Sequence, residues 1–199
     1  MPTPRGRWLG HARRLTVLGL ALFGLSLIMS GLLGAGALEE PALVVQTLPG
    51  GAVRASATLH FPVPRALLHA VLTDYAHWPD LFDVRMKLIR FEPHEGGAVT
   101  DLAIQHLLLP GERRLVCDSQ ETPDGGLVTS LIGGDFRQYR RVWRLSADEG
   151  GHATRADFEI LVEVDTLAPS WLVALGLRRE LDAHFRIVRE KAISRLRAR

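Results

Sequence analysis

The sequence predicts an α+β domain, in which an antiparallel sheet of about seven strands is followed by a long C-terminal helix. Three observations support this class. Strand-length segments separated by short turns fill residues 84–164. These turns are too short for the crossovers that parallel strands need, so neighbouring strands run antiparallel. A single amphipathic helix is expected before them, and an apolar stripe at helical spacing follows them over residues 170–196.

The N-terminal part of the domain is predicted to contain one strand and two helical pieces. Alternating residues over 53–61 indicate a strand, which Pro62 ends. Apolar residues at helical spacing then predict a helix over 65–75. Pro79 breaks this helix and leaves room only for a short helical turn over 80–82.

Six further strands and the long helix complete the predicted domain. The strands span 84–91, 98–108, 112–120, 127–132, 136–145 and 153–164. The last of them alternates between apolar and charged residues, which is typical of a half-buried antiparallel strand. Ser170 is expected to cap the long helix, with Leu177, Leu181 and Phe185 in its apolar stripe.

The turns between the predicted strands differ in character at the two ends of the sheet. Alternate turns of a meander lie at opposite ends. One set (92–97, 121–126 and 146–151) is acidic and rich in glycine, and the other set (107–111, 132–136 and 166–172) carries large apolar side chains. Either these apolar side chains fold inward and close the sheet, or they form the entrance of an apolar cavity, where a ligand enters or a membrane is contacted. The candidate entrance residues are Leu108, Leu109, Phe136, Leu167 and Trp171.

The charged side chains are unevenly distributed, although the net charge is only +2. Residues 1–37 contain four arginines and no acid, and residues 38–177 contain 12 bases against 19 acids. The stretch from Arg178 onward contains eight bases against three acids. A nucleic-acid-binding surface needs bases clustered on the folded body. We therefore expect no nucleic acid partner.

The N-terminal segment has the order of a secretory signal. Arginines precede an uncharged apolar run over 15–33, which is followed by small residues ending at Ala37. The run is also close to the roughly 20 residues that span a bilayer, so an uncleaved anchor is the alternative. Both cases place the domain outside the cytoplasm, as a periplasmic or otherwise extracytoplasmic protein. The expected organisation is a signal peptide or anchor over 1–37, a linker over 38–52 and a ligand-binding domain over 53–199.

Catalytic and metal-binding motifs are absent from the sequence. The single cysteine, Cys117, excludes an internal disulfide and lies between apolar residues as expected of core filling. The eight histidines have no ligand spacing. We therefore expect neither a metal nor a cofactor.

Polar side chains on apolar strand faces are the candidate ligand contacts. His106 shares a predicted strand face with Leu102 and Ile104, and Arg141 shares one with Tyr139 and Trp143. Phe158 and Leu181 complete the candidate set. A buried arginine must be paired or must serve a ligand, so Arg141 is either the anchor for a ligand carboxylate, phosphate or carbonyl, or a residue at the sheet margin paired to Asp157 or Glu159. A strand bulge would put Arg140 in its place.

Residues 67–82, with the sequence LLHAVLTDYAHWPDLF, resemble the first-helix signature of the START-like (SRPBCC) superfamily. The most similar branch is the coenzyme Q-binding and polyketide cyclase/dehydrase group. Gly134-Asp135-Phe136, Trp143-Arg144-Leu145 and Pro169 before the last helix follow the same pattern. The resemblance implies a helix-grip fold, in which a curved antiparallel sheet wraps around the C-terminal helix and encloses an apolar tunnel. It also implies binding of lipids, quinones or polyketides, with cyclase activity in a minority of members.

The function expected from these features is binding of a hydrophobic small molecule by an exported carrier, transfer or sensing protein, with contact to a membrane surface. One alternative is a cyclase or dehydratase acting on a polyketide-like substrate, with Tyr139 or His106 as acid or base and Arg141 stabilising an enolate. A second alternative is a periplasmic module that docks a protein through the apolar turns. The sequence identifies no protein partner.

Overall fold

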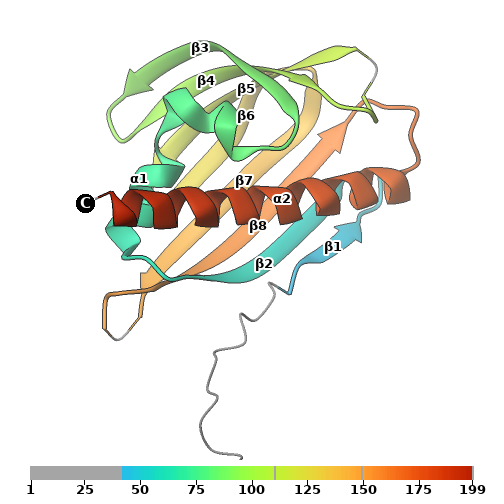
Figure 1. Cartoon of the computed structure of the whole chain (residues 1–199). Coiled ribbons are helices and arrows are strands. Elements are labelled where there is room, and N and C mark those ends of the chain that lie inside the picture. The colour runs from blue at the N-terminus through green and yellow to red at the C-terminus, as the bar shows by residue number, and fades with distance from the viewer. Residues whose placement is uncertain (1–41, 110, 149, 199) are drawn as a thin grey trace, which may run out of the picture. The chain divides into compact units, whose positions relative to one another are not determined.

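A curved antiparallel sheet packs one face against a long helix (Figure 1). The structure is a computed structural model that describes residues 42–109, 111–148 and 150–198. The predicted α+β class and helix-grip architecture are confirmed. The predicted signal or anchor segment, 1–37, lies outside the described residues. None of the described helices is long and apolar enough to span a membrane.

The sheet has eight strands, and their spatial order is β1-β2-β8-β7-β6-β5-β4-β3 with every neighbouring pair antiparallel. The strands are β1 (Val44–Thr47), β2 (Val53–Phe61), β3 (Arg85–His94), β4 (Gly97–Gln105), β5 (Glu112–Glu121), β6 (Leu127–Gly134), β7 (Phe136–Ala147) and β8 (Thr154–Val164). The helices are α1 (Arg65–Leu72), the 3₁₀ helix η1 (Tyr75–Leu81) and α2 (Ser170–Arg197). Strands β3 to β8 form a meander, so the acidic turns and the apolar turns lie at opposite ends of the sheet, as predicted.

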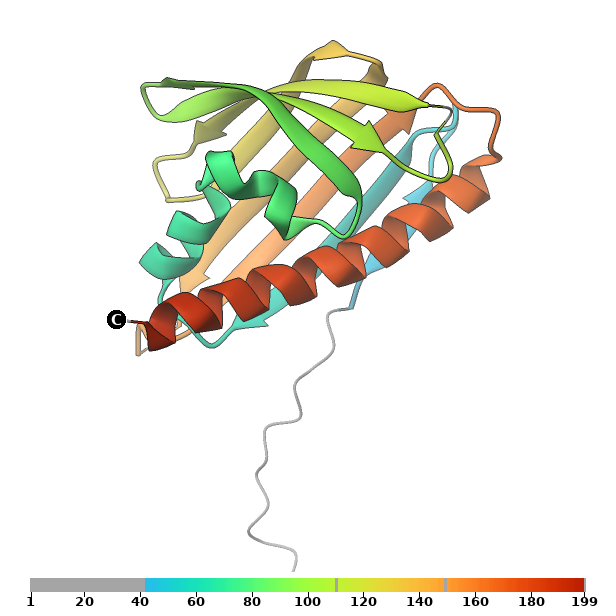
Figure 2. The same cartoon turned by 45° about the horizontal axis from the view of Figure 1, so that its top comes forward.

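Helix α2 lies along the concave face of the sheet, and α1 and η1 cover the same face (Figure 2). The predicted alternation in β8 is confirmed, because Ala156 and Phe158 are buried while Arg155 and Asp157 are not. Bulges in three ladders add local twist, between Leu88 and Arg90, Val116 and Cys117, and Phe136 and Gln138.

Several elements differ from the prediction. Strand β1 falls in the predicted linker; it is short, mostly exposed and paired only to β2, so it has no periodicity to detect. The first helix ends at Leu72, and the next helical piece is a 3₁₀ helix of seven residues. Strand β4 ends at Gln105, which places His106 and Leu108 in the following turn. The cap of α2 is Pro169 without any side-chain hydrogen bond, so a capping role of Ser170 is wrong.

An aromatic cluster fills the space between α2 and the middle of the sheet. Trp143 is its centre, with ring centroids at 4.7 Å from Phe158, 5.9 Å from Phe185 and 6.5 Å from Phe61. His184 of α2 is also buried here. Its Nδ1 donates to the carbonyl oxygen of Leu81 at 2.8 Å, so the other ring nitrogen is bare in the neutral tautomer. This cluster blocks the inner end of the space between helix and sheet.

The buried His184 makes the stability of the fold dependent on pH. Burial, assisted by the charge of Arg141, lowers the pKa of His184 from 6.5 to about 3. Above pH 6.5 the imidazole is neutral in both states, and below it the unfolded chain binds a proton that the native state does not bind. We expect the free energy of unfolding to fall by about 2 to 3 kcal/mol between about pH 7.5 and pH 4.5 from this group. Urea unfolding at both pH values measures the free energy of unfolding.

His184→Asn is expected to flatten that pH dependence, whatever its effect at neutral pH. His152→Asn, at an exposed position, is the matched control and leaves the dependence unchanged. An unaltered slope in His184→Asn would contradict the assignment.

Candidate functional site: an apolar pocket under the long helix

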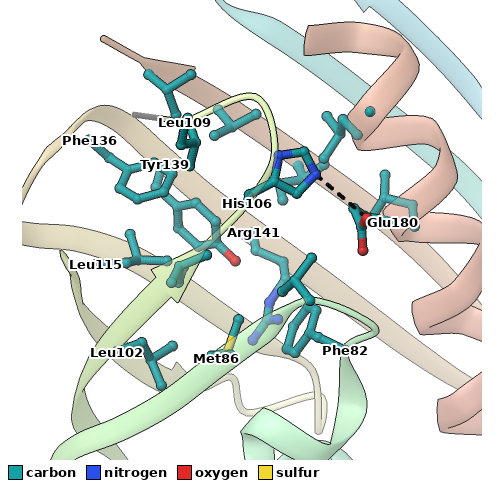
Figure 3. Close-up of a pocket in the computed structure, with 18 of the residues that line it drawn as sticks. Phe82, Met86, Leu102, His106, Leu109, Leu115, Phe136, Tyr139, Arg141 and Glu180 are labelled. Atoms are coloured by element: carbon teal, nitrogen blue, oxygen red, sulfur yellow. Dashed lines mark ion pairs between the residues drawn. The ribbon is translucent and has the colours of Figure 1, made fainter. Parts of the chain in front are cut away.

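A pocket lies between the N-terminal half of α2 and the sheet (Figure 3). Its lining residues on α2 lie between Val173 and Leu181, and those of the aromatic cluster, His184 and Phe185, follow them. Its lining comes from η1 and the segment after it, from strands β3 to β8, from the β4–β5 turn and from α2, and most of the side chains are apolar. Its cavity volume is about 160 Å³, and one side of it is open. A concave lining that is mainly apolar, with a few polar groups, is typical of sites for small apolar ligands.

The structure brings most of the predicted site residues into this one lining. Those in the lining are Leu102, Ile104, His106, Leu108, Leu109, Phe136, Tyr139, Arg141 and Leu181. Trp143 and Phe158 lie instead in the aromatic cluster. Each is two residues along its strand from a residue that lines the pocket, Arg141 or Ile160, on the side that the aromatic cluster fills. Leu167 and Trp171 are exposed to solvent and are absent from the lining. The predicted alternatives for the apolar turns therefore both occur: some of these side chains fold inward, and others remain exposed.

Several lining residues were missed by the sequence analysis. They are Trp78, Phe82, Val84, Met86, Leu115, Cys117, Thr129, Ile160, Val162, Val164, Val173, Gly176, Leu177 and Glu180. The alternation of β8 and the stripe of α2 already pointed to Ile160, Val162 and Leu177. Glu180 had a signal too, since it is an acid next to Leu181 and one turn from Leu177 and Gly176.

Arg141 is the one arginine in the lining, which contains no lysine, and its side chain is only 4% exposed. It lies in the middle of β7, opposite Thr129 of β6 and Ile160 of β8. Its guanidinium carbon is 4.4 Å from the ring centre of Trp78 and 5.7 Å from that of Phe82. This stacking on aromatic faces favours the cation but supplies no hydrogen bond.

The predicted pairing of Arg141 at the sheet margin is wrong. Glu159 pairs with Arg144 at 3.1 Å, and Asp157 accepts from Thr58 at 2.7 Å. Within the described residues, Arg141 has no ion pair, and its Nε has no hydrogen-bond partner. The bulge in β7 leaves Arg140 exposed, so Arg141 is the inward-facing arginine.

Two further ionisable groups beside Arg141 are neutral at physiological pH. Burial raises the pKa of the Tyr139 hydroxyl, and it raises the pKa of the Cys117 thiol to about 12. The charge of Arg141 opposes both shifts and is outweighed. The pocket around the guanidinium therefore contains no thiolate or phenolate to neutralise it.

A histidine and a carboxylate, His106 and Glu180, lie close together at the open side of the pocket. His106 Nδ1 accepts a hydrogen bond from the backbone N–H of Leu108 at 3.1 Å, so the neutral ring carries its proton on Nε2. That Nε2 lies 3.6 Å from Glu180 Oε1, and the other carboxylate oxygen of Glu180 is buried without a partner (Figure 3). Thr166 also donates to the carbonyl oxygen of Leu108 at 2.9 Å. The β4–β5 turn is thus connected to both α2 and the loop that precedes it.

Among the described side chains, no three His, Cys, Asp or Glu residues come together in a group that could hold a metal ion. The pocket offers apolar enclosure, one buried cation and a histidine–carboxylate pair at its open side. These features define a helix-grip domain for hydrophobic ligands.

The chain belongs to the family described as "Polyketide cyclase / dehydrase and lipid transport", which it matches over residues 61–184. The predicted START-like relationship is thereby confirmed. The family description names polyketides and lipids and not coenzyme Q, so a quinone ligand stays a prediction. No curated protein matches the sequence.

Solved structures with the same fold come from several bacteria. The START superfamily protein of Mycobacterium smegmatis has a TM-score of 0.57 and 13% identity, over 71% of this chain and 97% of its own. The protein TTHA0849 of Thermus thermophilus has the same values. The ZhuI aromatase/cyclase of Streptomyces sp. R1128 has a TM-score of 0.58 and 14% identity, over 74% of this chain and 97% of its own. At these identities the likeness concerns the fold.

Gly176 is expected to keep the pocket open. A Cβ atom at this position would lie 2.7 Å from the Leu108 side chain and 3.5 Å from the His106 ring. Gly176→Leu should fill this space and weaken binding of the neutral fluorescent probe N-phenyl-1-naphthylamine by about tenfold or more, since several apolar contacts are lost. Fluorescence titration measures the affinity.

The control adds the same side chain to the same helix at the exposed Ser194, distant in sequence from the pocket. Ser194→Leu should bind the probe as the wild type does. Equal affinities for the wild type and Gly176→Leu would show that the probe binds elsewhere.

Proposed function

We propose that the protein is an exported carrier that binds a hydrophobic small molecule in this pocket and exchanges it at a membrane surface. The observation that carries the proposal is the juxtaposition of the pocket with exposed apolar side chains at the same end of the domain. A soluble domain exposes such a group of side chains only at a cost, so a contact surface is its best explanation.

These exposed side chains form what we call the apolar tip: Leu107, Leu167, Trp171 and Leu175. Leu107 is 97% exposed and Trp171 is 64% exposed. Leu107 and Leu175 line a groove that shares His106, Gly176 and Glu180 with the pocket. A ligand leaving the pocket on this side would therefore pass Leu107 and Leu175 of the tip. Tryptophan is also a side chain that favours the membrane interface.

Export is supported by the order of the N-terminal segment, in which arginines precede an apolar run and small residues at Ala37. In either case this segment would place the domain outside the cytoplasm, and a retained anchor would also hold it beside a membrane. The family description, which includes lipid transport, agrees with such a role.

A cyclase is the second candidate, because the family description also names cyclases and dehydrases. Its acid and base would come from Tyr139 and from the His106–Glu180 pair, with Arg141 at the substrate oxygen. The raised pKa of Tyr139 suits a proton donor better than a base. The pocket itself serves both functions, so catalysis has to be tested directly.

The carrier proposal predicts that the protein retains its cargo on purification. Native mass spectrometry of the protein, purified from its own host without detergent, should show a bound small molecule that organic extraction removes. A protein that is ligand-free under these conditions and turns over a linear poly-β-ketone would contradict the carrier and support the cyclase.

The apolar tip should mediate contact with membranes. Trp171→Asp and Leu167→Asp are each expected to weaken binding to phosphatidylethanolamine–phosphatidylglycerol vesicles by at least about tenfold, because an apolar contact is replaced by a charge repelled from the anionic surface. Vesicle sedimentation of the full chain measures it.

Ile89→Asp is the matched control, since Ile89 is an exposed apolar residue on β3, 58% exposed and outside the tip. All variants share the same N-terminal segment, so that segment cannot account for a difference between them. Equal losses in all three variants would indicate non-specific adsorption, and no loss in the tip variants would contradict a membrane contact of the tip.

A further inference from the structure

The strongest unexplained feature of the molecule is the charge of Arg141. Its side chain is 4% exposed, its Nε has no hydrogen-bond partner, and no carboxylate of the described residues forms an ion pair with it. An isolated charge in an apolar interior is strongly unfavourable unless it is paired and hydrogen-bonded. The aromatic rings of Trp78 and Phe82 offset part of this cost and leave the Nε–H group unsatisfied.

The ionisable groups around Arg141 do not compensate its charge. The neighbouring Tyr139 and Cys117 remain protonated, and the neighbouring His184 is neutral because its pKa is lowered to about 3. Arg141 contributes to that lowering. The guanidinium therefore projects a full positive charge into the pocket, and an anion placed beside it would satisfy both the charge and the free donor.

The pocket is also electrically polarised along its length. Arg141 lies in the middle of β7, whereas the one acid in the lining, Glu180, lies at the open side beside His106. An anionic head group near the open side would meet this carboxylate, and one at the inner end would meet the guanidinium. Apolar side chains of Ile160 and Val162 contribute to the wall between the two ends.

We propose that the pocket binds a long-chain monocarboxylate, with the carboxylate on Arg141 at the inner end and the hydrocarbon tail leading out to the apolar tip. This inference rests on the proposed function, because it assigns a ligand class to the same pocket. One negative charge matches the site, since no second arginine or lysine of the described residues lines the pocket to receive a phosphate dianion. The planar fork of an arginine fits a carboxylate in two parallel hydrogen bonds.

The test compares ligands that differ only in the head group. Dodecanoic acid, dodecanol and dodecyl phosphate displace N-phenyl-1-naphthylamine from the full chain at neutral pH, and their affinities are measured by competition. The acid should bind about tenfold to hundredfold more tightly than the alcohol, which is the effect of hydrogen bonds to a charged group. The phosphate should bind no more tightly than the acid. Equal or tighter binding of the alcohol, or tightest binding of the phosphate, would overturn the inference.

Substitutions of Arg141 assign the preference to its side chain. Arg141→Met keeps the apolar stem, and it should bind dodecanol as the wild type does while losing the preference for the acid. Arg141→Lys keeps the charge without the planar fork, and it should retain a reduced preference even if the methionine variant fails to fold. A full preference in a folded Arg141→Met variant would overturn the assignment.

The orientation has its own readout in the fluorescence of Trp78. 2-Bromododecanoic acid carries its quencher beside the head group, and 12-bromododecanoic acid carries it at the tail. The first should quench the part of the emission that Trp78→Phe removes, and the second should not. The reverse result would overturn the head-inward orientation.

The outcomes separate this inference from the carrier proposal. If dodecanol displaces the probe and the acid has no advantage, the pocket binds apolar ligands and only the inference fails. If none of the three ligands displaces the probe, while the folded protein still binds it, the carrier proposal itself fails.

Discussion

The packing of α2 against the concave face of the sheet is the constraint on which the rest of the structure depends. The C-terminal half of the helix buries Phe185 and Val188, and Phe185 packs against Trp143 in the filled part of the interior. The N-terminal half presents Gly176 and Leu177 instead, and the interior beneath it stays unfilled. One helix therefore provides both the core that holds the domain together and the wall of its cavity. Because the two halves of α2 differ in this way, the packed core and the pocket lie one after the other along the helix, between the helix and the sheet.

The sequence predicted the fold well because its signals are periodic. The meander, the two contrasting sets of turns and the long helix follow from alternation and spacing alone. Strand β1 escaped because a four-residue edge strand has no buried face to leave a pattern. Trp143 and Phe158 were assigned to the ligand because a strand face shows which side chains point inward, and only the packing partner decides whether they meet protein or empty space. That partner, α2, lies far away in the chain.

Arg141 shows a similar limit of sequence reasoning. The alternation along β7 predicted that the Arg141 side chain points inward. It did not predict whether the guanidinium pairs with a carboxylate of the protein or with a ligand. That choice depends on Glu159 and Asp157, whose side chains point to the opposite face of β8 and have partners there. The stacking residue Trp78 comes from η1, a seven-residue 3₁₀ segment interrupted by non-helical dihedral angles at His77, which is too short to show a period. Irregular segments thus contribute contacts that pattern analysis does not reach.

The aromatic cluster around Trp143 has a consequence for selectivity. It fixes the depth of the pocket at one end, while the other end opens between exposed apolar side chains. In the proposed orientation, the aromatic cluster limits how far the head group of a ligand can enter, and the rest of a longer ligand would extend out of the pocket toward the apolar tip. Such a site would be selective for the head group of a ligand and would accept tails of different lengths. Under the proposed carrier function, a single protein of this design would serve a homologous series of compounds that differ in chain length.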